Sequence, residues 1–286
     1  MEGRLAQAGL RGDGRGAGDG RALGECEAGQ LAHSAGSARV ARGRTEALAA
    51  VKLELAEPVP GRPAACRVAV DVAEAGPRGS RAQELRLKQL GARVERLLLG
   101  PPSCPRGPLD EGNDLAVVPG ETVWLFYVDL LVLHDDGSLM ETLALATKLA
   151  LQSTTMPKAA AVEVEGEGDL GLEAGLGGGP TEIEVDDDPA SGWRLRLDHV
   201  PLVVVVGVVG GRHVVDPTAE EEAGAEATVE LAINRKGNIL GSQVFGPGAL
   251  EPSLLRDIVE AACAAGVAYH RTFAEGLAGV GAGVGA

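Results

Sequence analysis

The alternation of hydrophobic and polar residues in the first part of the chain predicts a sheet with helices packed against it. Residues 37–42 and 46–54 follow the two-residue period of a strand, and Gly43-Arg44 between them predicts a tight turn. Residues 81–99 place apolar side chains at helical spacing and end before Gly100. The predicted elements are strands at 37–42, 46–54, 67–72 and 122–133 and helices at 81–99 and 139–151.

The second part of the chain repeats this scheme over a shorter length. Its apolar run at 202–208 predicts a buried strand, and Arg235-Lys236-Gly237-Asn238 predicts the turn of a hairpin. Ser253 is a candidate cap for a final amphipathic helix. The predicted elements are strands at 194–197, 202–208, 213–215, 228–234 and 239–244, a short helix at 219–226 and a long helix at 253–273. The repeated order predicts two similar α+β halves packed together.

Three segments rich in Gly, Ala and charged residues interrupt these patterns, at 9–24, 166–180 and 276–286. They carry too little apolar surface to offset the conformational entropy that is lost on ordering. We therefore expect a flexible N-terminal extension at 1–24, a first half at 25–190 with a flexible loop at 166–180, a second half at 191–275, and a disordered tail at 276–286.

Composition narrows the class of protein. A chain of 286 residues with 45% hydrophobic content can bury a sizeable core. No uncharged apolar run reaches the length of about 18 residues needed to cross a membrane, and the N-terminus lacks the apolar region of a secretory signal. We therefore expect an intracellular protein with no membrane partner. A net charge of −15 and 2% aromatic residues exclude proteins that coat nucleic acid by bulk charge or by base stacking.

Metal chemistry has little support in the sequence. The chain has four cysteines, Cys26, Cys66, Cys104 and Cys263. They form no CxxC pair and have no histidine at the spacing of a zinc finger, so they predict neither a zinc site nor a disulfide framework. We expect no metal site and no cofactor.

One short segment of this acidic chain is basic. Residues 78–96 hold six Lys or Arg residues against two acids. Arg78 and Arg81 lie in a Gly-Pro-Arg-Gly-Ser-Arg loop, whose glycines allow a strand of RNA to approach the backbone closely. Two interpretations stay open: the segment is a solvated helix face, or Arg78 and Arg81 bind the phosphates of RNA.

Three stretches together resemble a known family. They are Gly36-Ser37-Ala38-Arg39-Val40, the strand at 123–133 with Asp136-Gly137-Ser138-Leu139 after it, and Gly211-Arg212-His213-Val214-Val215-Asp216-Pro217-Thr218 with Glu220, Glu221 and Glu222. These stretches resemble the RNase PH-like subunits of the RNA exosome. The Asp-Pro-Thr turn and its glutamate run are most similar to the silent partner type, and the resemblance covers residues from about 30 to 275.

The resemblance implies an α+β RNase PH-like fold, related to domain 2 of ribosomal protein S5, with two pseudo-repeated β/α halves. It implies a structural role in a six-membered ring of RNase PH-like exosome subunits, which threads RNA through a central pore for 3′-to-5′ processing and degradation, ribosomal RNA included. Cap subunits of S1/KH type and a separate nuclease are implied as further partners. The implied locations are the nucleus, the nucleolus and the cytoplasm.

The resemblance also implies a chemistry, which this chain has in part lost. Active members cleave RNA from its 3′ end by phosphorolysis, which needs a holder for phosphate and carboxylates for a divalent ion or the leaving oxygen. In active members the turn after the long central strand reads Gly-Gly-Thr-Arg, whereas this chain has Gly137-Ser138-Leu139-Met140. Because a thioether supplies no charged N–H donors, Leu139 and Met140 indicate a degenerate site without catalytic residues.

The two carboxylate positions of the implied site differ less from active members than the phosphate-holding turn does. Asp216 matches the first of two aspartates of active members, and Glu222 replaces the second. Either Asp216 and Thr218 cap a short helix with an acidic first turn, or Asp216 and Glu222 serve an active phosphorolytic 3′-to-5′ exoribonuclease. The loss of the phosphate holder favours a subunit that is not itself an enzyme.

Overall fold

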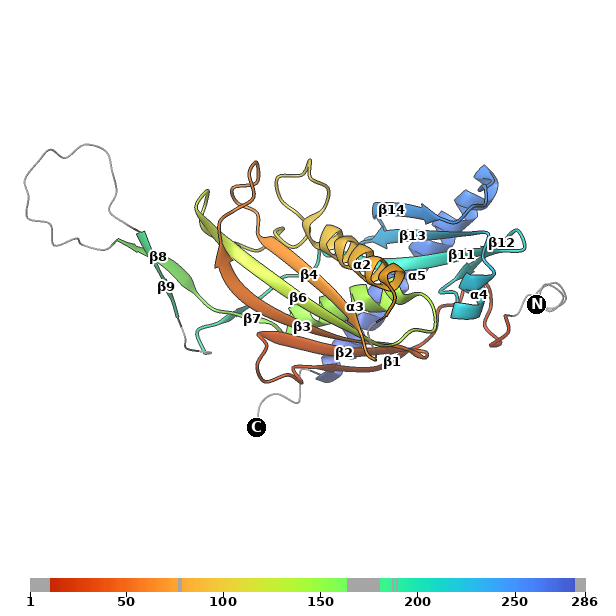
Figure 1. Cartoon of the computed structure of the whole chain (residues 1–286), viewed down its shortest axis with the longest axis horizontal. Coiled ribbons are helices and arrows are strands. Elements are labelled where there is room, and N and C mark those ends of the chain that lie inside the picture. Colours follow the sequence, from red (N-terminus) through yellow and green to blue (C-terminus); the bar gives the residue numbers. More distant parts are fainter. Residues whose placement is uncertain (1–10, 77–78, 164–180, 187, 189, 281–286) are drawn as a thin grey trace, which may run out of the picture.

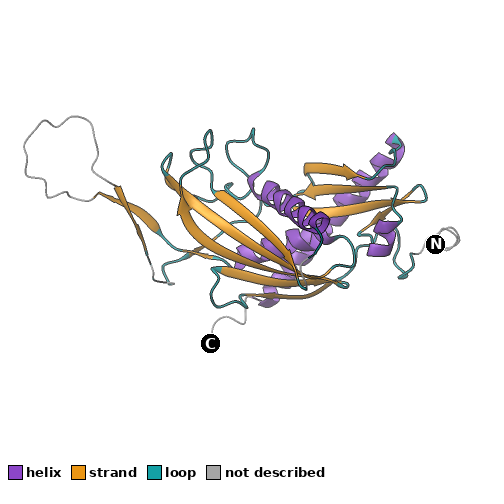
Figure 2. Ribbon diagram, viewed as in Figure 1, coloured by secondary structure: helices purple, strands orange, loops and turns teal. Residues whose placement is uncertain are grey.

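The computed structural model describes residues 11–76, 79–163, 181–186, 188 and 190–280, so the loop expected at 166–180 lies outside the described residues. Two sheets lie on either side of a central helix, α3 (Leu139–Ser153), which contacts β2 and β3 of the first sheet and β11 of the second (Figure 1). Figure 2 shows the same division into strands and helices. The mixed α+β architecture in two parts is therefore confirmed.

The first sheet has the strand order β1, β2, β3, β6, β4, with β5 paired to β6. All neighbours run antiparallel except β4 and β6, which are parallel. The strands are β1 (Leu23–Ala28), β2 (Gly36–Arg42), β3 (Thr45–Ala56), β4 (Arg67–Glu74), β5 (Ala116–Val118) and β6 (Thr122–His134). The four predicted strands are confirmed. The sequence did not predict β1, because this edge strand is only half buried and its apolar alternation is weak.

Helix α2 (Arg81–Leu99) packs on β4 and has the predicted bounds. It begins after Ser80, whose Oγ accepts a hydrogen bond from the N–H of Gln83 at 3.3 Å, and ends at Gly100, whose φ of 67° suits glycine. Helix α3 is buried on all sides, as expected for a helix between two sheets. As a result, its charged residues Glu141 and Lys148 are also buried.

The second sheet has the order β12, β11, β13, β14, and all its neighbours are antiparallel. Helix α5 packs on β11, β12 and β13. The elements are β11 (Leu202–Val209), β12 (Arg212–Val215), α4 (Ala219–Ala223), β13 (Ala227–Ile233), β14 (Ile239–Phe245) and α5 (Pro252–Val280). The predicted strands at 202–208, 213–215, 228–234 and 239–244 are confirmed, and α4 ends three residues earlier than the predicted 226.

Helix α5 differs from the prediction at both ends. It begins at Pro252, because proline suits the first position of a helix, so Ser253 lies inside the helix and is not its cap. It continues to Val280. Residues 276–280 are therefore helical where a disordered tail was expected, and 281–286 lie outside the described residues.

Two short strand pairs complete the fold. Strand β7 (Thr155–Met156) pairs with β10 (Trp193–Arg194), where a longer strand at 194–197 was predicted. Strands β8 (Ala159–Glu163) and β9 (Thr181–Val185) pair in an arm that projects from the main body (Figure 1). None of the helices in the described ranges combines the length and the apolar character that would be needed to cross a membrane.

Residues 11–22 correct the expectation of a flexible extension at 1–24. The N–H of Val215 donates to the carbonyl of Ala17 at 2.8 Å, and Arg11 is buried. The composition of this Gly-rich segment does not show that its arginines meet buried carboxylates more than 190 positions further along the chain. Those contacts hold the segment in place. Residues 1–10 lie outside the described residues.

Candidate functional site

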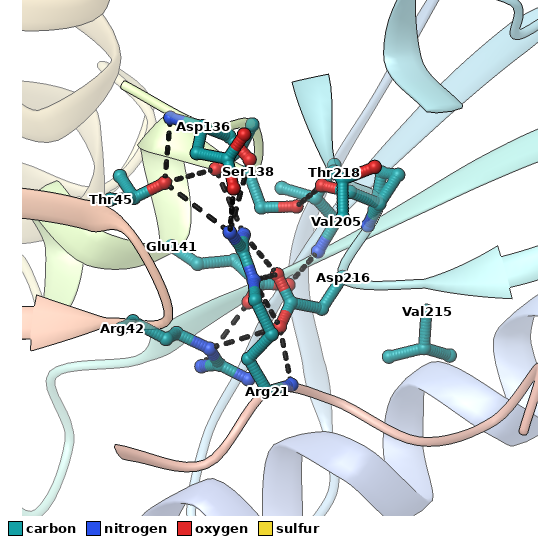
Figure 3. Close-up of polar contacts among 12 residues, drawn as sticks. Arg21, Arg42, Thr45, Asp136, Ser138, Glu141, Val205, Val215, Asp216 and Thr218 are labelled. Carbon is teal, nitrogen blue, oxygen red and sulfur yellow. Dashed lines mark hydrogen bonds and ion pairs between the residues drawn. The ribbon is translucent and has the colours of Figure 1, made fainter. Parts of the chain in front are cut away.

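The candidate site centres on Asp216, which directly follows β12. Its side chain is buried, and its φ of 52° lies in the left-handed region that residues other than glycine seldom adopt. The N–H of Arg21 donates to Asp216 Oδ2 at 2.6 Å, and Nη2 of the same arginine donates to Oδ1 at 2.6 Å (Figure 3). Nε of Arg42 donates to Oδ2 at 3.2 Å. Both carboxylate oxygens are therefore held by charged donors.

These donors decide the protonation state of Asp216. Burial by itself would raise its pKa, but the hydrogen bonds and positive charges of Arg21 and Arg42 outweigh burial and hold the pKa at about 2. Asp216 is therefore ionised at neutral pH, and the arginines of its own chain balance its charge. In this state it is neither a proton donor nor an open ligand for a metal ion.

The N-terminal segment supplies most of these arginines. Arg11 Nη1 donates to the carbonyl of Val215 at 2.6 Å, and Arg11 Nε donates to Glu221 Oε1 at 2.9 Å. Arg15 Nη1 donates to the carbonyl of Asp216 at 3.2 Å. We refer to Arg11, Arg15, Arg21, Arg42, Glu141, Asp216 and Glu221 as the arginine cluster.

Arg42 connects this cluster to helix α3. Its Nη1 lies 3.2 Å from Glu141 Oε2, and its guanidinium stacks 3.9 Å from the ring centroid of Tyr269 on α5. Glu141 also accepts a hydrogen bond from the N–H of Val205 on β11 at 2.5 Å. Burial raises the pKa of Glu141 to about 8, and Arg42 opposes this only in part. The cluster therefore connects both sheets with helices α3 and α5.

The turn before α3 is the position where active relatives were expected to hold phosphate. Its Ser138 has a φ of 49°, and the Ser138 N–H donates to Glu222 Oε1 at 2.8 Å. Arg21 donates to the carbonyls of Asp136 at 3.0 Å and Gly137 at 2.9 Å (Figure 3). The N–H of Ser138, just before α3, already donates its hydrogen bond to Glu222. A phosphate at this helix start would therefore meet the Glu222 carboxylate and be repelled.

The two other residues of the expected phosphate-holding turn are Leu139 and Met140. Leu139 and Met140 are buried, and Met140 lines a cavity of about 580 Å³ that involves neither Asp216 nor Glu222. Among the described residues, no group of three or more His, Cys, Asp or Glu side chains is placed to hold a metal ion. Within the described residues, Asp216 and Glu222 thus have protein partners, and Met140 lines a cavity apart from both.

The prediction that Asp216 and Thr218 cap a short helix is confirmed for Thr218 and wrong for Asp216. Thr218 caps α4 in a capping box: its Oγ1 accepts from the N–H of Glu221 at 3.4 Å, while Glu221 Oε2 accepts from the N–H of Thr218 at 2.9 Å. Asp216 does not cap the helix, because its carboxylate is turned to Arg21 and Arg42. The two expected carboxylates, Asp216 and Glu222, thus have separate partners.

Of the two RNA-binding candidates, only Arg81 lies among the described residues. Arg81 is exposed as the first residue of α2, whereas Arg78 lies outside the described residues. RNA contact by this pair stays a prediction.

Sequence reasoning missed five residues of the arginine cluster and their neighbour Tyr269. The missed members are Arg11, Arg15, Arg21, Arg42 and Glu141. One signal was present: Arg11, Arg15 and Arg21 recur within a short Gly- and Asp-rich segment, which is unusual for a simple linker. Nothing local to Glu141 marks it, because it lies in an apolar helix and meets Arg42 only in the fold.

Comparisons with known proteins agree with this fold. Among named relatives, the exosome complex component Rrp42 of Methanocella arvoryzae is 28% identical over 271 residues, which cover 90% of this chain and 88% of the relative. A Dictyostelium discoideum protein named for the exosome exonuclease RRP42 is 31% identical over 157 residues, 55% of this chain and 45% of the relative. A chain of the Archaeoglobus fulgidus exosome, solved with RNA bound to the active site, superposes with a TM-score of 0.67 at 25% identity and 95% coverage of each chain.

Family models give the assignment. The model for domain 1 of the 3′ exoribonuclease family, RNase PH, matches residues 23–157, from β1 to β7. The model for domain 2 of the same family matches residues 199–265, which hold the second sheet and the first half of α5. Together the two models cover more than half of the 286 residues. The chain therefore belongs to the 3′ exoribonuclease family and has the two domains of the RNase PH fold.

Proposed function

We propose that this chain is a non-catalytic ring subunit of an RNA exosome, which supports 3′-to-5′ RNA processing and degradation without cleaving RNA itself. One observation carries the proposal: side chains of the chain fill the site at which the family's chemistry was expected. Arg21 and Arg42 hold Asp216, and Glu222 occupies the N–H of Ser138. At this site, as the described residues form it, a phosphate nucleophile therefore has no holder and a divalent ion has no open carboxylate pair.

Membership of a ring is supported by the relatives and by an exposed sheet edge. The named relatives are exosome components. Strand β14 is the last strand of its sheet, and four of its apolar side chains are exposed: Ile239, Leu240, Val244 and Phe245. An exposed apolar edge strand is a liability unless another chain covers it. The partners that we propose are other RNase PH-like subunits in a six-membered ring.

RNA, cap subunits and a separate nuclease complete the proposed assembly. In this arrangement RNA passes through a central pore and is cleaved by another subunit. Arg78 and Arg81 are the proposed contacts to its backbone, since they begin the most basic segment of an acidic chain. The nucleus, nucleolus and cytoplasm are the proposed locations, which fluorescence microscopy of the tagged chain tests.

The decisive experiment is a phosphorolysis assay. The purified chain is incubated with single-stranded RNA, Mg²⁺ and phosphate, and the release of nucleoside diphosphate is measured. We expect none above background, while an active RNase PH enzyme releases it under the same conditions. Release that is lost in both Asp216→Asn and Glu222→Gln, with circular dichroism unchanged, would instead identify an active exoribonuclease.

Assembly has a separate test. Obligate interfaces in stable assemblies often bury more than about 2,000 Å² of largely apolar surface. The chain alone is therefore expected to self-associate, and to become monodisperse on co-expression with a second RNase PH-like subunit, as measured by size-exclusion chromatography with light scattering. A monodisperse monomer that captures no such subunit contradicts the ring proposal but leaves catalytic silence untouched.

A further inference from the structure

A second cavity, which no residue of the arginine cluster lines, is positively charged. It has a volume of about 700 Å³ and lies between α3, α5 and the turn that joins β13 to β14. Its charged lining consists of Lys148, Arg196, Arg235 and Arg271 together with a single acid, Asp198. In a chain of net charge −15, such a concentration of cations raises the local concentration of anions.

The inner wall of this cavity holds a buried ammonium group without a carboxylate partner. The side chain of Lys148 is buried, and among the described residues it takes part in no ion pair. Its Nζ donates to the carbonyl of Val200 at 2.6 Å and lies 3.5 Å from Nδ1 of His270. Buried charges in proteins are normally paired, because removing a charge from water is costly. When Lys148 is protonated, its positive charge therefore has no counterion among the described residues.

His270 does not supply the missing negative charge. Its Nε2 lies 2.9 Å from the carbonyl of Ile233, so Nε2 carries the proton and Nδ1 accepts from Lys148. Burial and, to a smaller extent, the positive charge of Lys148 lower the pKa of His270 to about 4, so the ring is neutral near pH 7. An ammonium group has three N–H donors, and Val200 and His270 use two of them. Nζ also lies 5.5 Å from the ring centroid of Phe273, so the third donor of the protonated Lys148 has an aromatic neighbour but no oxygen or nitrogen acceptor among the described residues.

The remaining charged groups at the cavity leave a net positive charge. Asp198 is exposed and already paired with Arg235, whose Nη1 lies 2.5 Å from Asp198 Oδ1. Arg196 and Arg271 are exposed side chains of the same lining, and neither takes part in an ion pair within the described part of the chain. One buried ammonium and two guanidinium groups thus face one space. Guanidinium and ammonium together are the usual ligands of tetrahedral oxyanions.

We propose that this cavity binds a phosphate group, with Lys148 at its inner end and Arg196 and Arg271 at its walls. The chemistry is that of a tetrahedral oxyanion, which a free phosphate or the phosphodiester backbone of RNA can supply. The site goes beyond the proposed ring function, because it uses none of the residues at the degenerate turn or at Asp216. Its occupation would supply the counterion that Lys148 lacks.

Sulfate is the best first probe, because its charge is constant over the pH range of interest. Burial lowers the pKa of Lys148 to about 7, with Asp198 opposing and Arg235 reinforcing the effect, so the charged fraction of Lys148 falls about tenfold between pH 6 and pH 8. If sulfate binds only the charged form, its affinity falls by the same factor. Binding is measured by calorimetry and by the rise in Tm, at an ionic strength held constant with chloride.

Lys148→Met tests the site, and Lys236→Met is the matched control. Methionine keeps the length of the side chain and removes an unpaired buried charge, so Lys148→Met is expected to fold and to be at least as stable as the wild type. It should lose the sulfate response and its pH dependence. Lys236 is exposed in the adjoining turn and does not line the cavity, so Lys236→Met should keep both.

Two further arms identify the source of the phosphate and set the limit of the proposal. Inorganic phosphate and a single-stranded RNA are compared on the wild type and on Lys148→Met. Stabilisation by RNA that depends on Lys148 assigns the site to the RNA backbone, and stabilisation by inorganic phosphate alone assigns it to a free anion. The proposal is overturned if sulfate and phosphate leave the wild-type Tm unchanged, or if they shift the wild type and Lys148→Met equally.

Discussion

Replacing Asp216 by Asn tests whether the arginine cluster holds the N-terminal segment and the two sheets together. The amide keeps the shape of the side chain but removes the charge that faces Arg15, Arg21 and Arg42. The side chains of Arg21 and Arg42 are only 8% and 4% exposed, so water cannot replace the lost carboxylate. An asparagine amide would also place an N–H₂ donor against the donors of the arginines.

The size of the expected loss in stability follows from the burial and the charged partners of Asp216. The fall of its pKa from 3.8 to about 2 corresponds to about 2 kcal/mol of stability at neutral pH. Removing one partner of a buried ion pair usually costs about 3–5 kcal/mol, because the other charge stays buried without compensation. We therefore expect Asp216→Asn to lower the free energy of unfolding by about 4 kcal/mol and Tm by about 10 °C.

Urea unfolding followed by the fluorescence of the two tryptophans, Trp124 on β6 and Trp193 on β10, measures this change on the purified chain. Limited digestion with trypsin is a second readout, since Arg15 and Arg21 become accessible if the segment detaches. The matched control is Asp129→Asn, because Asp129 is half exposed and pairs with Lys52 at 2.9 Å. Exposed pairs of this kind contribute about 1 kcal/mol or less. An effect of Asp216→Asn no larger than that of the control would refute the reasoning.

Three further predictions follow from the same structure. The stability of the wild type should fall as pH decreases from 3.8 through about 2, because protonation removes the charge of Asp216, whose pKa is lowered in the folded state. Urea unfolding in acid should show a smaller fall in Asp216→Asn than in the wild type, the remainder coming from other carboxylates with lowered pKa values such as Glu221. Thr218→Ala should lower stability by about 1 kcal/mol through loss of the capping box of α4, whereas Thr218→Ser should restore it; equal Tm values for all three proteins would contradict this. The double change of Arg78 and Arg81 to Glu should weaken RNA binding by the reconstituted ring and lower the salt slope by roughly 0.7 for each lost phosphate contact, with assembly intact. Unchanged affinity would contradict this and would favour the interpretation of both arginines as solvated surface residues that do not bind RNA.

Most of the fold could be predicted from the sequence, because its signals are local. The bounds of α2 follow from apolar spacing between Ser80 and Gly100, and the strands β2, β3, β4 and β6 follow from alternation and turn residues. Edge strand β1 and the β8 and β9 arm were missed, since strands with little buried surface carry weak hydrophobic patterns. Their pairing depends on neighbours from other parts of the chain.

By itself the sequence determined which side chains stand at the positions where the resemblance implies a phosphorolytic site: Leu139 and Met140 at the turn, and the carboxylates of Asp216 and Glu222. Only the tertiary structure decided what these groups do. Arg21 is 195 positions from Asp216, and Ser138 is 84 positions from Glu222, so no local pattern connects the members of either pair. The same holds for Lys148, whose ammonium is unusual only because folding removes it from water without bringing a carboxylate to it. Side-chain identity is local, whereas burial and charge compensation depend on which distant residues the fold brings into contact.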